Sequence, residues 1–397
     1  MVWRHTPRIP VMQERRVRMK NRVFLALVLA AVLSFGAMVP AMAEDTIKIG
    51  GLAPLTGSVA QYGIAVKEGA DLYISQLNAA GGIDGKKVEI LWEDEKGDVT
   101  EAINAYNKLV YQDGVVAILG DVTSKPTLAV GDLAVTDGIP MITASSTAYD
   151  VTTDKPNVFR SCFLDPFQAE TMANFAKDEF GATKLAVLYD IGDDYSTGLA
   201  EAFKAQAEKN GQVIVAYESG AGADVDFKSQ LTKIKDAAPE VLFVAEYLQP
   251  AALIIKQASD IGLDVKFLGA DGIGGIESLM DKADLALLEK MFYSDHFAAD
   301  ATSEAVVKFN ADFAAAYGKA PYSAFNATAY DAAMILCEAI KAAGSTEAEA
   351  VVAAMKATAV DGVTGHITFD DHNDPTKNAF ITTFKDGAKV FFKVQEP

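Results

Sequence analysis

The chain of 397 residues is poor in the side chains that usually carry metal binding or nucleophilic catalysis, with two cysteines and four histidines. Cys162 and Cys337 match neither a disulfide framework nor a zinc site in their spacing. Two separate buried thiols are the favoured interpretation, and a single disulfide is the alternative. No histidines have metal-ligand spacing, so we expect His296, His366 and His372 on the surface or in loops. The sequence predicts no metal and no cofactor.

Positive charge is also scarce. The 35 Lys and Arg residues stand against 54 Asp and Glu residues, a formal net charge of −19. Nucleic acids and anionic lipids require a basic protein surface, so this balance argues against both as partners. Arg160 is the only arginine after Arg22. Because a guanidinium is a rigid planar fork of donors, we expect Arg160 to position a hinge segment.

Only one long apolar run is present, near the N-terminus. A basic start, Met19–Arg22, precedes the apolar run Val23–Val39 and an A-x-A motif that ends at Ala43. This order predicts a secretory signal peptide, residues 1–43, cleaved after Ala43. The run is short for a membrane span of ~20 residues, although a retained anchor is the alternative. Residues 1–18 lack any such pattern, so we expect them to precede the real start.

From Thr46 onward, short apolar runs alternate with amphipathic stretches, which predicts α/β architecture with doubly wound parallel sheets. The pattern occurs twice, and a chain of this length is expected to form two domains. The first predicted set comprises strands Ile47–Leu52, Lys87–Trp92, Val115–Gly120 and Pro140–Thr143, with helices Tyr62–Asn78, Val99–Tyr111 and Pro126–Val135. The second comprises strands Lys184–Tyr189, Gln212–Tyr217, Val241–Val244 and Lys266–Leu268, with helices Tyr195–Glu208, Phe227–Ala237 and Ala251–Ile261.

The last third of the chain is predicted to complete these two domains rather than form a third. Its predicted elements are helices Ala305–Tyr317, Ala324–Ala342 and Glu347–Thr358 and a hairpin around Asp386-Gly387. The expected crossings between domains are Asn157–Phe163, Ser294–His296 and Val363–Gly365. We therefore predict a signal peptide (1–43), an N-terminal lobe (44–163 plus 296–364) and a C-terminal lobe (164–295 plus 365–397). A multi-strand hinge between the lobes would let a cleft close on a ligand.

Ligands of open α/β sheets bind outside the carboxyl ends of the strands. In the first lobe, the tips Gly120–Lys125 and Ala144–Thr147 carry hydroxyls and helix starts. In the second lobe, Asp190–Tyr195, Glu246–Tyr247 and Gly269–Gly272 carry carboxylates and tyrosines. Hydroxyls and helix N-termini bind a carboxylate well, whereas an ammonium group requires a carboxylate acceptor. This asymmetry predicts a small zwitterionic ligand.

Ordinary structural roles remain alternatives for these residues. Ser124 and Ser145 are equally consistent with helix capping, Asp271 with a turn, and the tyrosines with packing. Asp94 and Glu95 imitate a catalytic pair, but we favour an exposed, solvated strand end. The chain has no G-x-S-x-G motif, P-loop or dinucleotide fingerprint. We therefore expect a binding protein and not an enzyme.

Several segments together resemble one known family. They are Pro54–Gly63, Asn78–Lys87, Phe159–Cys162, Asp194–Ala200 and Gly269–Gly272. On these motifs, residues Ile47–Pro397 resemble the periplasmic leucine/isoleucine/valine-binding proteins, the branched-chain amino-acid class of type I solute-binding proteins. The resemblance implies a type I periplasmic binding fold and a monomer in the periplasm. It also implies a branched-chain amino-acid ligand (Leu, Ile or Val) and the membrane permease of an ABC importer as partner.

The resemblance also implies roles for individual residues. Ser124 and Thr147 would bind the ligand carboxylate through their hydroxyls, and Ser145 through its backbone N–H. Asp271 would bind the ammonium group. The remaining implied contacts are the aromatic residues Tyr62, Tyr195, Tyr247 and Phe325.

Two departures from the family pattern concern the ligand. The leucine-binding type has a glutamate in place of Asp271 and a small apolar residue in place of Ser145. A methylene of pocket space is worth only about 1–3 kcal/mol in discrimination, so an aliphatic amide or urea-like ligand of a sensor remains the alternative. The predicted signal peptide favours a transport receptor over a cytosolic sensor, and the missing nucleophile–base pairs disfavour a secreted enzyme.

Overall fold

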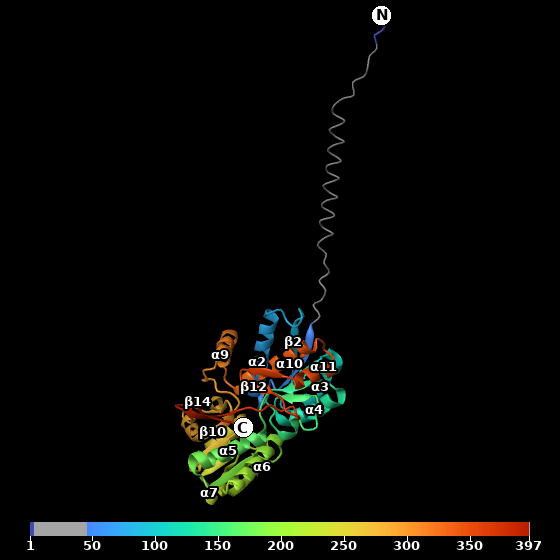
Figure 1. Cartoon of the computed structure of the whole chain (residues 1–397). Helices are drawn as coiled ribbons and strands as arrows, with labels where there is room; N and C mark the ends of the chain where they lie inside the picture. Colours follow the sequence, from blue (N-terminus) through green and yellow to red (C-terminus); the bar gives the residue numbers. More distant parts are fainter. Residues whose placement is uncertain (4–45, 397) are drawn as a thin grey trace. The chain divides into compact units, whose positions relative to one another are not determined.

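The structure, a computed structural model, describes residues 1–3 and 46–396. The apolar run and the cleavage site after Ala43 lie outside these residues, so the signal peptide stays a prediction. Among the helices of the described segments, none combines the length and the apolar character needed to cross a membrane. From Thr46 onward, the chain is organised around two large β-sheets (Figure 1).

The first sheet has five parallel strands in the order β2-β1-β3-β4-β5. These strands are β1 (Ile47–Ala53), β2 (Val88–Asp94), β3 (Ala117–Leu119), β4 (Met141–Thr143) and β5 (Val158–Arg160). The helices that connect them are α2 (Ala60–Ala79), α3 (Val99–Lys108) with a following π-helical turn (Leu109–Asp113), and α4 (Ser124–Asp137). Strands β3 and β4 are buried throughout, as expected for parallel strands covered on both faces.

The second sheet has seven strands in the order β14-β13-β10-β9-β8-β6-β7. Its parallel strands are β6 (Lys184–Asp190), β7 (Val213–Gly220), β8 (Val241–Ala245), β9 (Lys266–Gly269) and β10 (Met291–Asp295). The antiparallel hairpin of β13 (Ala379–Lys385) and β14 (Ala388–Gln395) extends one edge. The associated helices are α5 (Asp165–Phe180), α6 (Asp194–Lys209), α7 (Lys228–Ala237) and α8 (Leu248–Asp260). The parallel strands repeat the order of the first sheet.

Three helices and a small hairpin return from the last third of the chain to the first sheet. They are α9 (Glu304–Tyr317), α10 (Ala324–Ala343), α11 (Ala348–Lys356), β11 (Ala359–Gly362) and β12 (Gly365–Thr368). Helix α10 packs so closely on α2 that a Cβ atom at Gly69 would lie 2.0 Å from the carbonyl oxygen of Asn326. The two helices, far apart in sequence, lie side by side in Figure 1.

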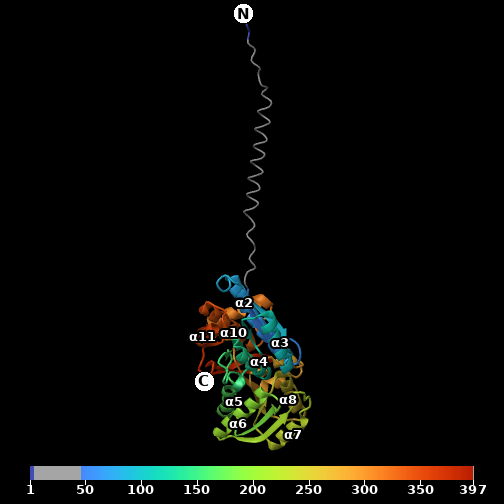
Figure 2. The ribbon, with the colours of Figure 1, turned by 90° about the vertical axis from the view of Figure 1, so that its right-hand side faces the viewer.

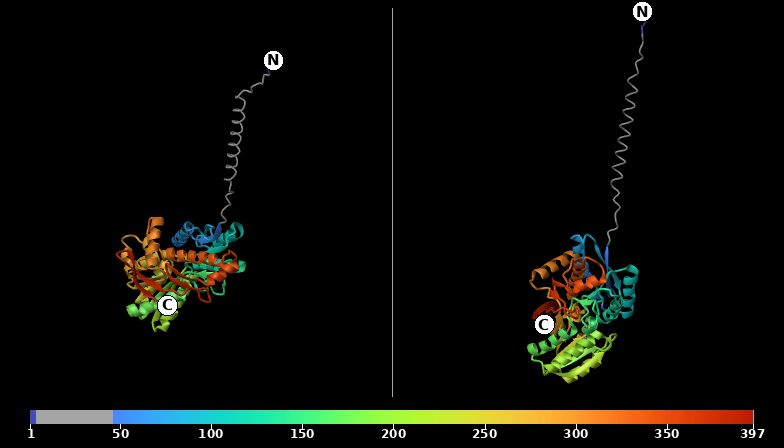
Figure 3. Two further views of the ribbon diagram at one scale, coloured as in Figure 1. Left: turned by 45° about the horizontal axis from the view of Figure 1, so that its top comes forward. Right: turned by 45° about the vertical axis from the view of Figure 1, so that its right-hand side comes forward.

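Each sheet is covered by helices on both faces, which confirms the doubly wound α/β prediction. One face of the first sheet packs against α2, α10 and α11, and the other packs against α3 and α4. In the second sheet, α5 and α6 cover one face, and α7 and α8 cover the other. Figures 2 and 3 show α5 to α8 grouped apart from the helices of the first sheet.

The predicted crossings between the sheets need correction at two places. Within Asn157–Phe163, residues Val158–Arg160 form the edge strand β5, so that crossing is limited to the residues just before α5. The crossing expected at Val363–Gly365 is wrong, because Gly362 pairs with Gly365 across the β11–β12 hairpin. The chain returns to the second sheet only after Thr368, where it goes on to form β13 and β14.

Two contacts explain why the chain turns at that hairpin rather than crossing. The carboxylate of Asp331, on α10, accepts hydrogen bonds from the N–H groups of Val363 at 2.7 Å and Thr364 at 2.9 Å. Gly365 has φ +112°, a conformation that favours glycine. The turn is therefore held against the first sheet's helices.

Arg160 lies fully buried at the end of β5. Its Nε is 2.6 Å from Asp374 Oδ1, and its Nη2 donates to Thr152 Oγ1 at 2.7 Å. Its Nη1 donates to the carbonyl oxygen of Ala148 at 2.9 Å. Asp374 belongs to the segment that leads from β12 to the second sheet. Arg160 thus joins two parts of the chain near the passage between the sheets, in line with the positioning role expected for it.

Candidate functional site

A cavity of about 230 Å³ lies between the strand tips of the two sheets. It is lined by all eight predicted site residues, Tyr62, Ser124, Ser145, Thr147, Tyr195, Tyr247, Asp271 and Phe325, and by Val122, Thr123 and Gly272. The strand order reverses beside β1 in the first sheet and beside β6 in the second, and ligand sites of such sheets lie at these reversals. The structure therefore brings the predicted residues together, while their contact with a ligand stays a prediction.

The first-sheet side of the cavity consists of the loops after β3 and β4. Thr143 Oγ1 donates to the carbonyl oxygen of Asp121 at 2.6 Å, and Ser145 Oγ donates to that of Val122 at 2.8 Å. These bonds hold the two loops together. They also mean that the Ser145 hydroxyl proton serves the loop, while the Ser145 backbone N–H donates to Thr143 Oγ1 at 3.3 Å.

Helix α4 begins at this same side of the cavity. Its N-cap residue, Thr123, makes no side-chain capping bond. Ser124 Oγ accepts a hydrogen bond from the N–H of Ala148 at 3.2 Å and so retains a proton to donate. Thr147 is fully buried beside Asp165. A helix N-terminus carries partial positive charge, so this side suits a carboxylate.

On the second-sheet side, Asp271 follows β9 and is 3% exposed. Its Oδ1 accepts hydrogen bonds from Tyr195 Oη at 3.0 Å and Gln168 Nε2 at 2.9 Å. Its Oδ2 lies 3.0 Å from His296 Nε2. Because a carboxylate offers about four lone-pair sites, these three partners leave one for a ligand's ammonium group.

Gln168 and Asp165, both on α5, were not predicted from the sequence. Gln168 Nε2 also donates to Asp165 Oδ1 at 2.7 Å, and its Oε1 accepts from Ser294 Oγ at 3.0 Å. Burial, reinforced by the negative charge of Asp271, raises the pKa of Asp165 well above its usual range. The shift favours the neutral form of Asp165, which lessens the repulsion between two adjacent carboxyl groups.

His296 was expected on the surface or in a loop, and the surface placement is wrong. Its side chain is 1% exposed, and its ring centroid lies 3.7 Å from that of Phe163. It follows β10 at the carboxyl end, so the strand-tip rule that found Asp271 also applies to it. Gln168 and Asp165 lie on a helix, where that rule gives no signal.

Tyr62 connects the two sides of the cavity. It lies on α2, yet its Oη donates to the carbonyl oxygen of Gly272 at 2.5 Å and accepts from the N–H of Leu248 at 2.9 Å. A second bridge is made by Lys125 Nζ, which donates to the carbonyl oxygen of Gly192 at 2.7 Å. Any opening of the cavity must break these hydrogen bonds.

Aromatic rings form the apolar wall. Tyr195 and Tyr247 stack with centroids 4.8 Å apart, and the centroid of Tyr62 lies 5.4 Å from that of Phe325. Burial raises the pKa of Tyr62, Tyr195 and Tyr247 well above the usual range, so all three phenols stay protonated. The wall suits an aliphatic group, while the hydroxyls remain donors.

Asp94 and Glu95 each accept hydrogen bonds from backbone N–H groups of nearby loops. Asp94 Oδ1 accepts from the N–H of Leu55 at 2.8 Å. Glu95 is fully buried, which corrects the expectation of a solvated strand end, and its Oε2 accepts from the N–H of Gly97 at 2.8 Å. Burial, with the charge of Asp121, raises the pKa of Glu95 to about 9, and burial raises that of Asp121 to about 7. Glu95 therefore donates its proton to Asp121 beneath the loop that lines the cavity.

Both cysteines are buried and free, as favoured from their spacing. Burial raises the pKa of the Cys162 thiol to about 12, so it is not a thiolate at neutral pH. Within the described ranges, no cluster of three or more His, Cys, Asp and Glu side chains is arranged to hold a metal ion.

Comparison with known proteins identifies a family with similar sequences. The family description "Periplasmic binding protein" matches residues 46–389. The leucine-, isoleucine-, valine-, threonine- and alanine-binding protein of Pseudomonas aeruginosa is 31% identical over 92% of this chain and 95% of its own length. The Leu/Ile/Val-binding protein BraC3 of Rhizobium johnstonii is 34% identical over 90% of this chain and 95% of its own.

Solved structures agree. The leucine-binding protein LivK from Thermotoga maritima is 30% identical, with a TM-score of 0.81 over 88% of this chain and 99% of its own. LivJ from Streptococcus pneumoniae, a branched-chain amino acid transporter substrate-binding protein solved with isoleucine, is 32% identical, with a TM-score of 0.82 over 89% of this chain and 100% of its own. With both sheets and the cavity covered by these matches, the chain belongs to the periplasmic binding protein family and has the type I fold.

Proposed function

We propose that the protein is the extracytoplasmic receptor of an ABC importer and binds a branched-chain amino acid, or a related small amino acid, in the cavity between the sheets. The observation that carries the proposal is the opposite chemistry of the two cavity ends. Asp271 lies at one end, and the start of α4 with its hydroxyls lies at the other. Relatives named for binding leucine, isoleucine and valine support it.

In this proposal, each end of the zwitterion has a defined partner. The ammonium group donates to Asp271, whose carboxylate is oriented by Tyr195 and Gln168. The carboxylate accepts from Ser124 and Thr147 hydroxyls and from the N–H of Ser145, which would exchange its long bond to Thr143 Oγ1 for the ligand. Burying both charges is favourable only when all their hydrogen bonds are made, which a closed cavity allows.

The ligand's side chain would contact the aromatic wall. Tyr62 and Phe325 offer an apolar surface without a charged group in the same cavity apart from Asp271. This composition favours aliphatic over charged side chains in this space. Because Asp271 is one methylene shorter than glutamate, the ligand's ammonium has room to sit deeper, and alanine or threonine could compete with leucine.

We further propose that two lobes close around the ligand. Residues 44–163 plus 296–364 would form the N-terminal lobe, and 164–295 plus 365–397 the C-terminal lobe, with the hairpin residues 365–368 moved to the first. The mature protein would begin after Ala43, reside in the periplasm as a monomer and present its closed form to a membrane permease. The hydrogen bonds of Tyr62 to Gly272 and Leu248 support a closed form, because they join the two lobes. Opening the lobes would break these bonds and change the surface that faces the permease.

Calorimetric titration of the purified protein, unfolded and refolded to remove carried-over ligand, tests the proposal. We expect leucine, isoleucine or valine to bind with a Kd in the micromolar range or tighter, and to be recovered chemically unchanged. Exclusive binding of amides or urea-like compounds would contradict the ligand. Absence of binding to every amino acid and amide would contradict the receptor role itself.

A further inference from the structure

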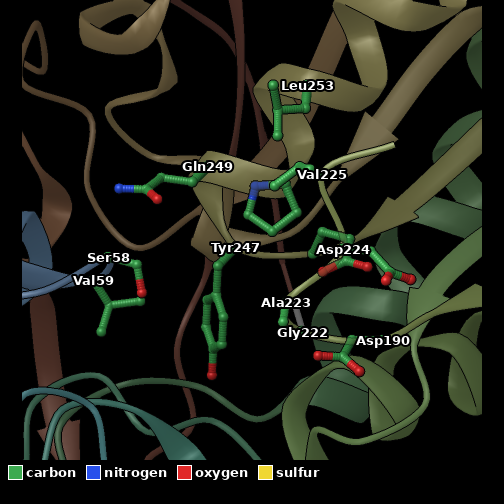
Figure 4. Close-up of a pocket in the computed structure, with 12 residues that line it drawn as sticks. Ser58, Val59, Asp190, Gly222, Ala223, Asp224, Val225, Tyr247, Gln249 and Leu253 are labelled. Atoms are coloured by element: carbon green, nitrogen blue, oxygen red, sulfur yellow. The ribbon is translucent and has the colours of Figure 1, made fainter. Parts of the chain in front are cut away.

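A second, larger cavity of about 580 Å³ adjoins the amino-acid cavity, and Tyr247 lines both. Its lining combines the carboxylates of Asp190, Asp224 and Glu246 with an apolar surface that includes Val59. Figure 4 shows Tyr247 between Val59 on one side and Asp190 and Asp224 on the other. Residues of both strand-tip regions therefore line this partly open space.

Glu246 is the residue that sets this cavity apart. Its side chain is 5% exposed and lines the cavity, yet its carboxyl makes no hydrogen bond or ion pair with any residue of the described ranges. Burial of a charge without a partner is strongly unfavourable. Burial raises its pKa to about 9, and the charges of Asp190, Asp193 and Asp224 add to the effect. The carboxyl therefore holds a proton, and an ammonium group placed in the cavity would supply the partner that its ionised form lacks.

The surrounding charges do not supply that cation. Asp190 Oδ1 and Asp224 Oδ2 accept backbone N–H bonds at 2.8 and 2.9 Å, and neither has a lysine partner in the described part of the chain. Lys125, on α4, faces Asp193 at the start of α6, and its ammonium donates to a carbonyl oxygen. The cavity thus keeps an excess of negative charge.

The chemistry favours an organic cation over a metal ion. In the part of the chain that the structure describes, no group of three or more His, Cys, Asp and Glu side chains is arranged to hold a metal ion. The cavity is also far larger than an ion, and Val59, Val225 and Leu253 give it an apolar wall. A primary ammonium group on an alkyl chain meets both conditions, because it has three donors for carboxylates and methylenes for the apolar wall.

We propose that this cavity is a second binding site, for a primary alkylammonium group, with Glu246 as its buried anionic partner. The group has two possible sources. It is either the side chain of a basic amino acid whose α-carbon groups occupy the neighbouring cavity, or a separate amine. Only the first source rests on the proposed amino-acid function; the site itself does not.

The primary test is titration of the refolded protein with n-butylammonium chloride at constant ionic strength, with n-butanol as the neutral probe of the same shape. We expect saturable binding of the ammonium compound and none of the alcohol. Glu246→Gln should weaken it at least tenfold, whereas Glu208→Gln, an exposed carboxylate on α6, should not change it. Asp224→Asn, an exposed position at the cavity, should weaken binding by a smaller factor.

Titrations in the presence of isoleucine distinguish a basic amino acid from a separate amine as the source of the ammonium group. Isoleucine binding also shows whether a variant is folded. If n-butylammonium binds equally well with isoleucine present, the site takes a separate amine. If the two exclude each other and lysine binds more tightly than either, one basic amino acid spans both cavities. Retained isoleucine binding by Glu246→Gln shows that the variant is folded. Equal binding of the alcohol and the ammonium compound, or binding unaffected by Glu246→Gln, overturns the proposal, even if isoleucine binds as expected.

Discussion

The two sides of the amino-acid cavity are built on sheets with the same parallel strand order, yet they hold their functional groups in different ways. On the first-sheet side, neighbouring loops fix one another through Thr143 and Ser145. On the second-sheet side, Asp271 is held by residues from three separate elements, through Gln168, Tyr195 and His296. One side is organised locally and the other by distant parts of the chain, so substitutions should act differently on each.

The largest effect should come from replacing Arg160, whose guanidinium joins the end of β5 to Asp374 in the segment that leads to the second sheet. Arg160→Met leaves Asp374 buried without its cation, which costs about 3–5 kcal/mol of folding stability. Urea denaturation followed by circular dichroism measures the loss. Lys282→Met, at an exposed position, is the matched control and should change little. A stability loss no greater than that of the control would show that the Arg160 contacts do not hold the passage.

The next largest effect should fall on ligand affinity from the second-sheet side. Asp271→Asn retains the side chain's shape but removes the charge opposite the ligand's ammonium, a loss of about 2–4 kcal/mol in binding free energy. Isoleucine affinity by calorimetry should fall at least 30-fold. Asp264→Asn, at a side chain 84% exposed, serves as control. Unchanged affinity would place the ammonium elsewhere.

The bridge between the two sides should contribute less. Tyr62→Phe keeps the aromatic wall but removes the hydrogen bonds to Gly272 and Leu248. Two neutral hydrogen bonds are worth about 1–2 kcal/mol together, so ligand release measured by stopped-flow fluorescence should accelerate about tenfold. Tyr111→Phe, on the exposed surface, should have no such effect. If release is unchanged, closure does not depend on the Tyr62 hydroxyl.

The buried pair beneath the first-sheet loops makes stability depend on pH. The folded protein keeps a proton on Glu95 up to about pH 9, whereas the unfolded chain releases it near the ordinary value of 4.5. The folded state therefore binds more protons, and stability falls as pH rises through that window. Glu95→Gln mimics the protonated form and should raise Tm by a few degrees at pH 8 but not at pH 4. An equal change at both values would contradict the assignment.

The smallest effect should separate two serines on the first-sheet side. Ser145→Ala removes a hydroxyl whose proton already serves Val122, so affinity should change less than about twofold. Ser124→Ala removes a proton available to the ligand carboxylate and should weaken isoleucine binding by about five- to tenfold. Calorimetry on the two variants side by side measures the contrast. The reverse order would mean that the loop bond to Val122 is given up on binding.

The contrast between local and long-range contacts also explains which features could be predicted from the sequence. Continuous apolar strands such as β3 and β4 and the polar tips after them are local patterns, and they were predicted correctly. Gln168 was missed because nothing local on α5 shows that it meets Asp271, more than a hundred positions later. Glu95 was placed in solvent because its burial against Asp121 depends on how β2 and β3 lie in the sheet.

The hairpin at Gly362–Gly365 gives the same lesson at the level of chain path. Its glycine and polar residues are typical of any connection, so the sequence indicated a crossing. The deciding contact is Asp331, a carboxylate on a helix that precedes the hairpin by about thirty residues. A side chain so far away in sequence leaves no local signal, and the turn is fixed only when α10 packs on the first sheet.

Because Arg160 is the only arginine after Arg22, limited proteolysis can measure how often the structure around it opens. Beyond Arg22, a protease that cuts only after arginine has a single target, the Arg160–Ser161 bond. Both residues are fully buried, so the intact protein presents no substrate there. Each cut must wait until β5 and the passage beside it open, and the rate of appearance of two fragments measures the frequency of that opening. Ligand that holds the two sides together should slow the cut, and the protein would thus report its own occupancy without a label.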